Sequence, residues 1–204
     1  NQIEPFSLIK PMDNVVIAYS LMPDLISKSL DNKTPSILKR INAMSLLASK
    51  GWKIGLRFDP LIHGKDWKDL YTKMIIMVFN SIPVSSIHSV SFGPLRFPKQ
   101  MFKDIFKLYP NEPLFLGPLS QNKGIISYST EIEQEMTFIA KSFGRKLAQR
   151  FDVEVFFIDE HLSSSEAKKE LKWHYAHKNA DRGEVDKRSA ELILQTWLNE
   201  TLPN

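Results

Sequence analysis

A repeated alternation of short apolar runs and helix-like segments constrains the fold more than any other feature of this sequence. The runs are rich in β-branched and aromatic residues, are bounded by proline or glycine as strands commonly are, and span residues 14–21, 52–60 and 86–94. A segment with helical periodicity follows each run, so strand and helix alternate roughly every 35 residues. This alternation predicts an α/β chain of parallel βα units, arranged either as part of a barrel or as an open sheet.

The three helical segments carry apolar residues at helical spacing. The first is predicted to start on Thr34 with Pro35 in the first helical position, and to stop at Gly51. The predicted buried stripes of the three helices are, in chain order, Ile37, Ile41, Met44 and Ala48; Leu70, Met74 and Met77; and Met101, Ile105 and Leu108.

A polar stretch, residues 120–130, is predicted to be a loop and to separate two domains. The first domain is expected over residues 1–129 and the second over residues 130–204. In the second, the sequence predicts a helix from 131, a strand at 153–159 and two further helices.

The absence of cysteine excludes several kinds of site. With none in 204 residues, this chain can form no disulfide and can hold neither Cys-ligated zinc nor a Cys-ligated iron–sulfur cluster. No run approaches the ~20 apolar residues that cross a bilayer, and the first residues lack the order of a signal peptide. We therefore expect a cytoplasmic protein with no membrane segment.

The charge is unevenly distributed along the chain. Residues 1–129 carry 16 Lys and Arg against nine Asp and Glu, a net +7, whereas residues 130–204 carry 11 against 14, a net −3. The basic excess suits a polyanionic partner such as nucleic acid, and it is also compatible with an ordinary solvated basic surface.

Acidic residues in the second domain occupy two positions where carboxylates can form a metal site. Asp159 and Glu160 end the predicted strand, and Asp186 lies on the apolar stripe of the last predicted helix. A strand-end acid facing a helix-borne acid can hold a divalent ion that activates water and neutralises charge on phosphate. The alternatives are acids at an exposed strand end, and a first-turn acid stabilised by the helix dipole.

Residues 130–204 resemble the C-terminal half of the RuvX/YqgF family, Holliday-junction-resolvase-like and pre-16S rRNA nucleases of RNase H fold. The stretches "VFFIDEHLSSSEA" and "GEVDKRSAELILQTWL" carry this resemblance and follow the family's order. The resemblance implies a partial RNase H-like segment in which Asp159, Glu160 and Asp186 are catalytic acids. It also implies that Asp159 and Asp186 bind Mg²⁺ or Mn²⁺.

This chain departs from the RuvX/YqgF pattern in two respects. His161 stands where the family usually has arginine after the acid pair. Ser163 and Glu166 follow the family pattern, and we interpret them as a helix capping box. The family also has an aspartate on its first strand, and the corresponding strand is absent from this sequence. We therefore expect an incomplete active site.

Residues 1–129 resemble the C-terminal part of the spore photoproduct lyase family, radical S-adenosylmethionine proteins that repair a DNA photoproduct on a partial (β/α) barrel. The stretches "RFDPLIH" and "SFGPLRFP" carry the most specific part of the resemblance. It implies that Ser20 and Asp59 face an S-adenosylmethionine pocket at the C-terminal ends of strands. Asp59 and His63 also fit ordinary loop residues after a strand. The family's cluster motif consists of cysteines, so no iron–sulfur cluster is expected in this chain.

Together these features favour a nucleic-acid-processing protein with a metal-dependent, nuclease-like second domain, because two candidate metal ligands are present there. Its expected partner is nucleic acid, either a DNA junction or an rRNA precursor. One alternative is a lyase-like DNA-repair protein without its cluster-binding portion, and another is a non-catalytic nucleic-acid-binding protein.

Overall fold

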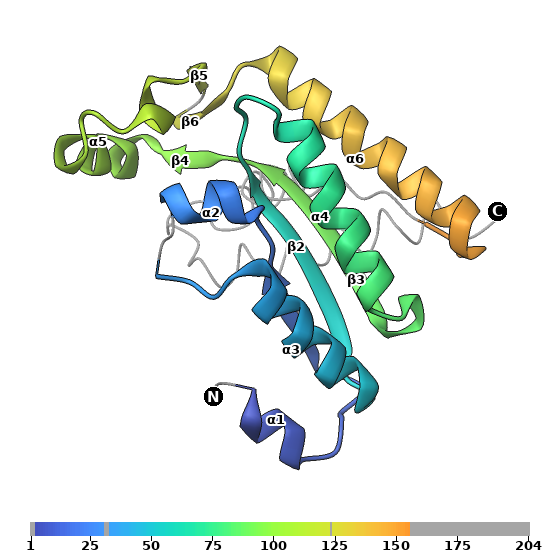
Figure 1. Cartoon of the computed structure of the whole chain (residues 1–204). Helices are drawn as coiled ribbons and strands as arrows, with labels where there is room; N and C mark the ends of the chain where they lie inside the picture. Colours follow the sequence, from blue (N-terminus) through green and yellow to red (C-terminus); the bar gives the residue numbers. More distant parts are fainter. Residues whose placement is uncertain (1–2, 31–32, 123, 156–204) are drawn as a thin grey trace, which may run out of the picture. The chain divides into compact units, whose positions relative to one another are not determined.

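The computed structural model describes residues 3–30, 33–122 and 124–155. By internal contacts, residues 1–146 form one compact unit and residues 147–204 another. The elements in chain order (Figure 1) are α1 (Glu4–Leu8), β1 (Val16–Ser20), α2 (Asp24–Leu30), α3 (Ile37–Ser49), β2 (Lys53–Leu61), α4 (Trp67–Ser81), η1 (Val84–Ser86), β3 (Ile87–Pro94), β4 (Arg96–Pro98), α5 (Lys99–Leu108), η2 (Pro113–Leu116), β5 (Leu119–Asn122), β6 (Ile125–Tyr128) and α6 (Thr130–Phe151).

The main sheet consists of three parallel strands in the order β1-β2-β3. The central strand β2 pairs with both neighbours; Ser20 of β1 and Ser91 of β3 lie on either side of Arg57. All three strands coincide with the predicted runs, and a helix follows each of the first two before the chain returns to the sheet. The prediction of an α/β chain built from parallel βα units is therefore confirmed.

Helices α3 and α4 lie over the same face of this sheet, in front of the strands in Figure 1. From β2 the side chains of Ile54, Leu56 and Phe58 are fully buried, as expected for alternate residues of a strand whose one face is covered. All four residues of the predicted α3 stripe are also buried. The core of the first unit therefore lies between β2 and these two helices.

The predicted ends of α3 are partly correct. The helix ends before Gly51, whose φ of 92° is a conformation that glycine adopts without steric cost. It begins later than predicted, however, because the side chain of Ser36 accepts a hydrogen bond from the Lys39 N–H at 3.4 Å and caps the helix. Thr34 and Pro35 therefore precede the helix.

The predicted stripe of α4 is displaced by about one residue around the helix. Met74 is buried as expected, but Met77 is 39% exposed, and the buried face passes through Tyr71, Ile75 and Val78. The large Tyr71 ring occupies the position on the sheet that the sequence pattern assigned to Leu70, because its hydroxyl contacts the chain beyond β2.

Helix α5 differs most from its prediction. Its expected core residues are largely exposed, Met101 by 51% and Leu108 by 73%, and the helix contains no buried residue. It packs beside the short strands β4 and β6 instead of the parallel sheet. Phe102 contacts Phe97 of β4 with ring centroids 5.9 Å apart, and it meets Phe115 of η2 edge to face at 5.4 Å.

The predicted loop at 120–130 is instead part of a second, antiparallel sheet with strand order β4-β6-β5. The hairpin between β5 and β6 turns near Gly124, which has a φ of 86°. Ser127 of β6 is buried and donates a hydrogen bond to the Leu95 carbonyl at 2.8 Å. This polar stretch forms strands because β4 supplies backbone partners, a contact that local sequence does not reveal.

Helix α6, Thr130–Phe151, confirms the helix predicted after this stretch. The predicted strand at 153–159 begins in residues without regular structure and continues beyond the described residues, as do the two later helices. The division at 129/130 stays a prediction. Within the described ranges, no helix is both long and apolar enough to cross a membrane.

Candidate functional site

The face of the parallel sheet opposite α3 and α4 is lined by small and polar residues. Strand register places these residues on one face, because side chains two apart along a strand point the same way. We call it the polar sheet face, and define it by Ala18, Ser20, Gly55, Arg57, Asp59, Ser89, Ser91 and Gly93.

Arg57 is held in a fixed position on this face. Its Nη1 donates to Ser89 Oγ at 3.0 Å and to its neighbour's carbonyl at 3.3 Å. The guanidinium extends over Gly55, where a Cβ would lie 3.1 Å from Nη2 and 3.2 Å from the Ala18 methyl carbon. Glycine at this position therefore leaves room for a positioned cation on the face.

Asp59 lies two residues further along β2, against the backbone of Gly93. A Cβ at Gly93 would lie 2.9 Å from the Asp59 carboxylate, closer than real side chains approach. The peptide bond from Asp59 to Pro60 is cis. Asp59 is exposed, and its carboxylate accepts no hydrogen bond from any described residue. It is thus a hydrogen-bond acceptor that is available to a ligand.

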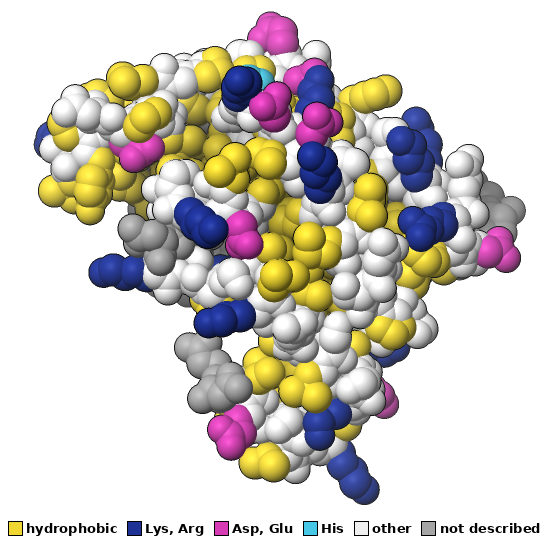
Figure 2. All heavy atoms as spheres, viewed as in Figure 1, with side chains coloured by type: hydrophobic (Ala, Val, Ile, Leu, Met, Phe, Trp, Pro, Cys, Tyr) yellow, Lys and Arg dark blue, Asp and Glu magenta, His cyan; other side chains and the backbone are white. Residues whose placement is uncertain are grey.

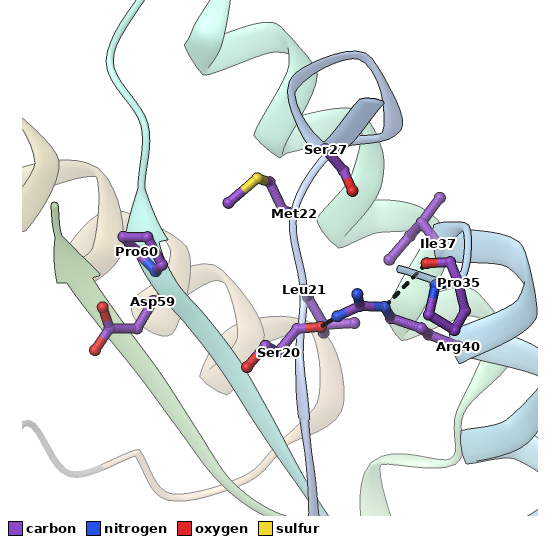
Figure 3. A pocket seen from close by; sticks show the side chains of 9 residues that line it. All are labelled: Ser20, Leu21, Met22, Ser27, Pro35, Ile37, Arg40, Asp59 and Pro60. Atoms are coloured by element: carbon purple, nitrogen blue, oxygen red, sulfur yellow. Dashed lines mark hydrogen bonds between the residues drawn. The ribbon is translucent and has the colours of Figure 1, made fainter. Parts of the chain in front are cut away.

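A pocket of about 220 Å³ opens where β1 and β2 end. It is lined by Ser20, Leu21, Met22, Ser27, Pro35, Ile37, Arg40, Asp59 and Pro60. Figure 3 shows Asp59 on the β2 side of the pocket and Arg40 on the α3 side. The two residues predicted to contact S-adenosylmethionine, Ser20 and Asp59, therefore lie at one pocket, and their role in binding a cofactor stays a prediction.

Arg40 closes the pocket on the α3 side. Its Nε donates to the Pro35 carbonyl at 3.1 Å, and its Nη1 donates to the Ser20 carbonyl at 2.5 Å (Figure 3). These two bonds fix the guanidinium and leave Nη2 without a hydrogen bond to described residues. The pocket is thus lined by a cationic donor, Arg40, and on its other side by an anionic hydrogen-bond acceptor, Asp59, whose carboxylate is turned toward Gly93 of β3.

Two tyrosines hold the chain that follows Asp59. The Tyr71 hydroxyl accepts from the Ile62 N–H at 3.1 Å and lies 3.3 Å from the Pro60 carbonyl. The Tyr128 hydroxyl accepts from the His63 N–H at 2.9 Å. Burial raises the pKa of both tyrosines above their ordinary value, so each hydroxyl keeps its proton.

His63 contributes to packing at this position. Its ring centroid lies 5.9 Å from the rings of both Trp67 and Tyr128. Because its backbone is also tied to Tyr128, the arrangement favours the interpretation of His63 as an ordered loop residue.

The predicted acids of the second domain, Asp159, Glu160 and Asp186, lie outside the described residues. Within the described part of the chain, no three His, Asp or Glu side chains come close enough together to hold a metal ion. The predicted metal site therefore stays a prediction.

Sequence reasoning missed Arg40, Arg57 and Gly93. The alternation of Arg57 and Asp59 along one strand could have placed both on one face, and a glycine inside the strand pattern at Gly93 could have indicated a close approach. No local signal identifies Arg40, because its position depends on how α3 packs beside β1.

Comparison with known proteins places this sheet in a family. A family model described as spore photoproduct lyase matches residues 9–151, more than half of the chain. The chain belongs to the spore photoproduct lyase family. A second family model, described as Holliday junction resolvase and named RuvX, matches residues 124–200. Both resemblances found in the sequence are therefore confirmed.

Solved spore photoproduct lyases share the fold. A variant with bound AdoMet and dinucleoside spore photoproduct superposes with a TM-score of 0.55 and 19% identity. The superposition covers 66% of this chain and 41% of that one. Another variant, with dinucleoside spore photoproduct alone, gives a TM-score of 0.54. At 19% sequence identity, this structural similarity establishes a shared fold.

Curated relatives match the other part of the chain. A pre-16S rRNA nuclease of Aeromonas salmonicida is 43% identical over 68 residues, which cover 33% of this chain and 49% of the relative. One from Picosynechococcus is 41% identical over 58 residues, covering 28% and 40%. The chain spans about half the length of the curated relatives it matches.

The contact between Gly93 and Asp59 predicts a stability effect of Gly93→Ala. The new methyl group forces the carboxylate out of its rotamer, so we expect the substitution to lower the free energy of unfolding by about 0.5–1.5 kcal/mol. In an Asp59→Ala background the clash is absent, and Gly93→Ala should be neutral or stabilising by up to ~1 kcal/mol. Urea unfolding of the four proteins of this cycle measures the difference.

Gly64→Ala serves as the control, because a Cβ there meets no atom within 4 Å. It should leave stability unchanged or raise it slightly in either background. Equal effects of Gly93→Ala with and without Asp59 would contradict the described contact.

Proposed function

We propose that the chain is a nucleic-acid-processing protein of the cytoplasm whose lyase-like segment binds S-adenosylmethionine at the β1–β2 pocket. The observation that carries this proposal is the meeting of Ser20, Arg40 and Asp59 at one pocket beside the C-terminal ends of parallel strands. Ligands bind at this edge in barrels and open sheets built from βα units. A solved relative of this fold holds AdoMet.

The chemistry of the pocket fits one end of this ligand. S-adenosylmethionine has an ammonium group and ribose hydroxyls that a carboxylate such as Asp59 can accept from, and a carboxylate that Arg40 Nη2 can bind. The pocket volume, about 220 Å³, is smaller than the roughly 300 Å³ at which ligand sites begin. The rest of the ligand would extend over the polar sheet face, toward Arg57.

We propose that this segment binds S-adenosylmethionine, and we propose no radical chemistry for it. In the family that the chain resembles, S-adenosylmethionine supplies radical chemistry together with a Cys-ligated cluster, and this sequence contains no cysteine. Among the chain's own residues, Asp59 would orient the ligand, Arg40 would neutralise its carboxylate, and the Tyr71 and Tyr128 contacts would keep the chain after Asp59 in place.

A second function is supported by similarity in the later part of the chain. The RuvX match over residues 124–200 and the identity to pre-16S rRNA nucleases support metal-dependent phosphodiester cleavage. Asp159 and Asp186, with Glu160 beside the first, supply oxygen ligands of the kind that Mg²⁺ and Mn²⁺ prefer. The proposed substrate is a DNA junction or an rRNA precursor.

The AdoMet proposal predicts a specific loss of affinity in Asp59→Asn. A hydrogen bond to a charged group contributes about 1.5–3 kcal/mol, so the substitution should weaken binding by roughly 10- to 100-fold. Ser20→Ala should weaken it by at most about tenfold. Titration calorimetry with S-adenosylmethionine measures both effects.

Asp69→Asn is the matched control, since Asp69 is an exposed acid on α4 that does not line the pocket. It should bind like the parent. An Asp59→Asn protein with unchanged affinity, or an equal loss in Asp69→Asn, would show that the ligand binds elsewhere or not at all.

The nuclease proposal predicts weak metal binding and slow cleavage. Titration with Mn²⁺ should give less heat for Asp159→Asn and Asp186→Asn than for the parent, and Asp69→Asn should match the parent. Cleavage of a four-way DNA junction or a precursor-rRNA end should be slow, because a lost catalytic ligand costs several kcal/mol and each ~1.4 kcal/mol is tenfold in rate.

Equal heats of Mn²⁺ binding for the parent and both variants would show that Asp159 and Asp186 do not form a shared metal site. Fast cleavage that disappears in both variants would contradict an incomplete site and show that two acids suffice.

A further inference from the structure

Helix α5 separates charge from apolar surface more sharply than its neighbours. At 100° per residue, Lys99, Lys103 and Lys107 follow one another along a single side of the helix. All three lysines are exposed, and in the described part of the chain no carboxylate lies within ion-pair distance of them. We call these three residues the lysine row.

The acid on the same helix, Asp104, forms no ion pair with this row. Both Asp104 carboxylate oxygens accept from Gln100 Nε2, at 3.0 and 3.2 Å. Nearby, the Glu112 side chain accepts from the Leu114 N–H at 3.4 Å and caps the turn after the helix. Three lysines against one acid therefore leave α5 with an excess of positive charge.

An exposed aromatic ring lies beside the lysine row. Phe106 is next to the row around the helix and is 37% exposed, and Tyr109 at the helix end is 62% exposed. The Phe106 ring stacks on the Phe102 ring of the same helix, with ring centroids 5.9 Å apart. Figure 2 shows other hydrophobic side chains gathered over the part of the surface that α5 occupies.

We infer that α5 is a binding surface for single-stranded nucleic acid. The lysine row spans about 12 Å, close to the rise of three or four phosphates in one strand of B-form DNA. An exposed ring beside a row of cations matches the combination by which proteins bind single strands, with phosphates on the cations and a base stacked on the ring. This inference rests on the nucleic-acid role proposed above and adds where the strand binds.

The test measures fluorescence anisotropy of a labelled 12-nucleotide oligothymidine at several salt concentrations. Each phosphate contact in a single strand contributes about 0.7 to the salt dependence, so Lys103→Gln/Lys107→Gln should reduce the slope by about 1.4. Phe106→Leu, which keeps an apolar side chain for packing, should lower affinity about tenfold with little change in slope, because stacking releases no counterions.

Lys39→Gln/Lys73→Gln is the charge-matched control, because it removes two exposed lysines from α3 and α4. This control variant should show the same salt dependence of oligonucleotide affinity as the parent. Glutamine keeps a helix propensity similar to that of lysine, so both double variants should fold.

Three outcomes would overturn the inference. If the parent binds the oligonucleotide and the α5 variant keeps the same slope, the surface lies elsewhere and the proposed nucleic-acid role stands. If the parent does not bind nucleic acid at any salt concentration, that role falls as well. If the parent binds phosphatidylserine vesicles but not the oligonucleotide, and Lys103→Gln/Lys107→Gln loses the vesicle binding, the partner of α5 is an anionic membrane.

Discussion

The pairing of β2 between two parallel neighbours is the constraint on which the first unit depends. It gives the strand two different faces: the covered face buries Ile54, Leu56 and Phe58 completely, and the other carries Arg57 and Asp59. Because side chains alternate along a strand, a single register fixes both the core and the polar sheet face. A slip of one residue would bury the two charged groups without partners, at a cost of several kcal/mol.

The charged groups of the polar sheet face lie beside glycines that leave space for them. Gly55 leaves space for the Arg57 guanidinium, and Gly93 leaves space for the Asp59 carboxylate. Arg40 is fixed by two backbone carbonyls at the same edge. A guanidinium held in this way needs little reorganisation when a carboxylate arrives, which supports the proposed binding of the carboxylate of S-adenosylmethionine by Arg40.

Sequence alone predicted the elements that have strong local periodicity. The three parallel strands, the buried stripe of α3 and the end of that helix at Gly51 follow from apolar spacing and glycine chemistry. The hairpin of β5 and β6 and the exposed stripe of α5 could not be predicted, because both depend on contacts with β4. The pocket residues Ser20 and Asp59 came from family resemblance, and Arg40 required the packing of α3.

The central claim is that the edge of the sheet at Ser20 and Asp59 binds S-adenosylmethionine. Amide chemical shifts of the isotope-labelled chain, followed while the ligand is added, test it most directly. We predict saturable shifts at the amides of Leu21, Arg40 and Asp59, with those of the α5 lysine row unchanged. Shifts confined to other parts of the chain, or no shifts at millimolar ligand, would contradict the claim.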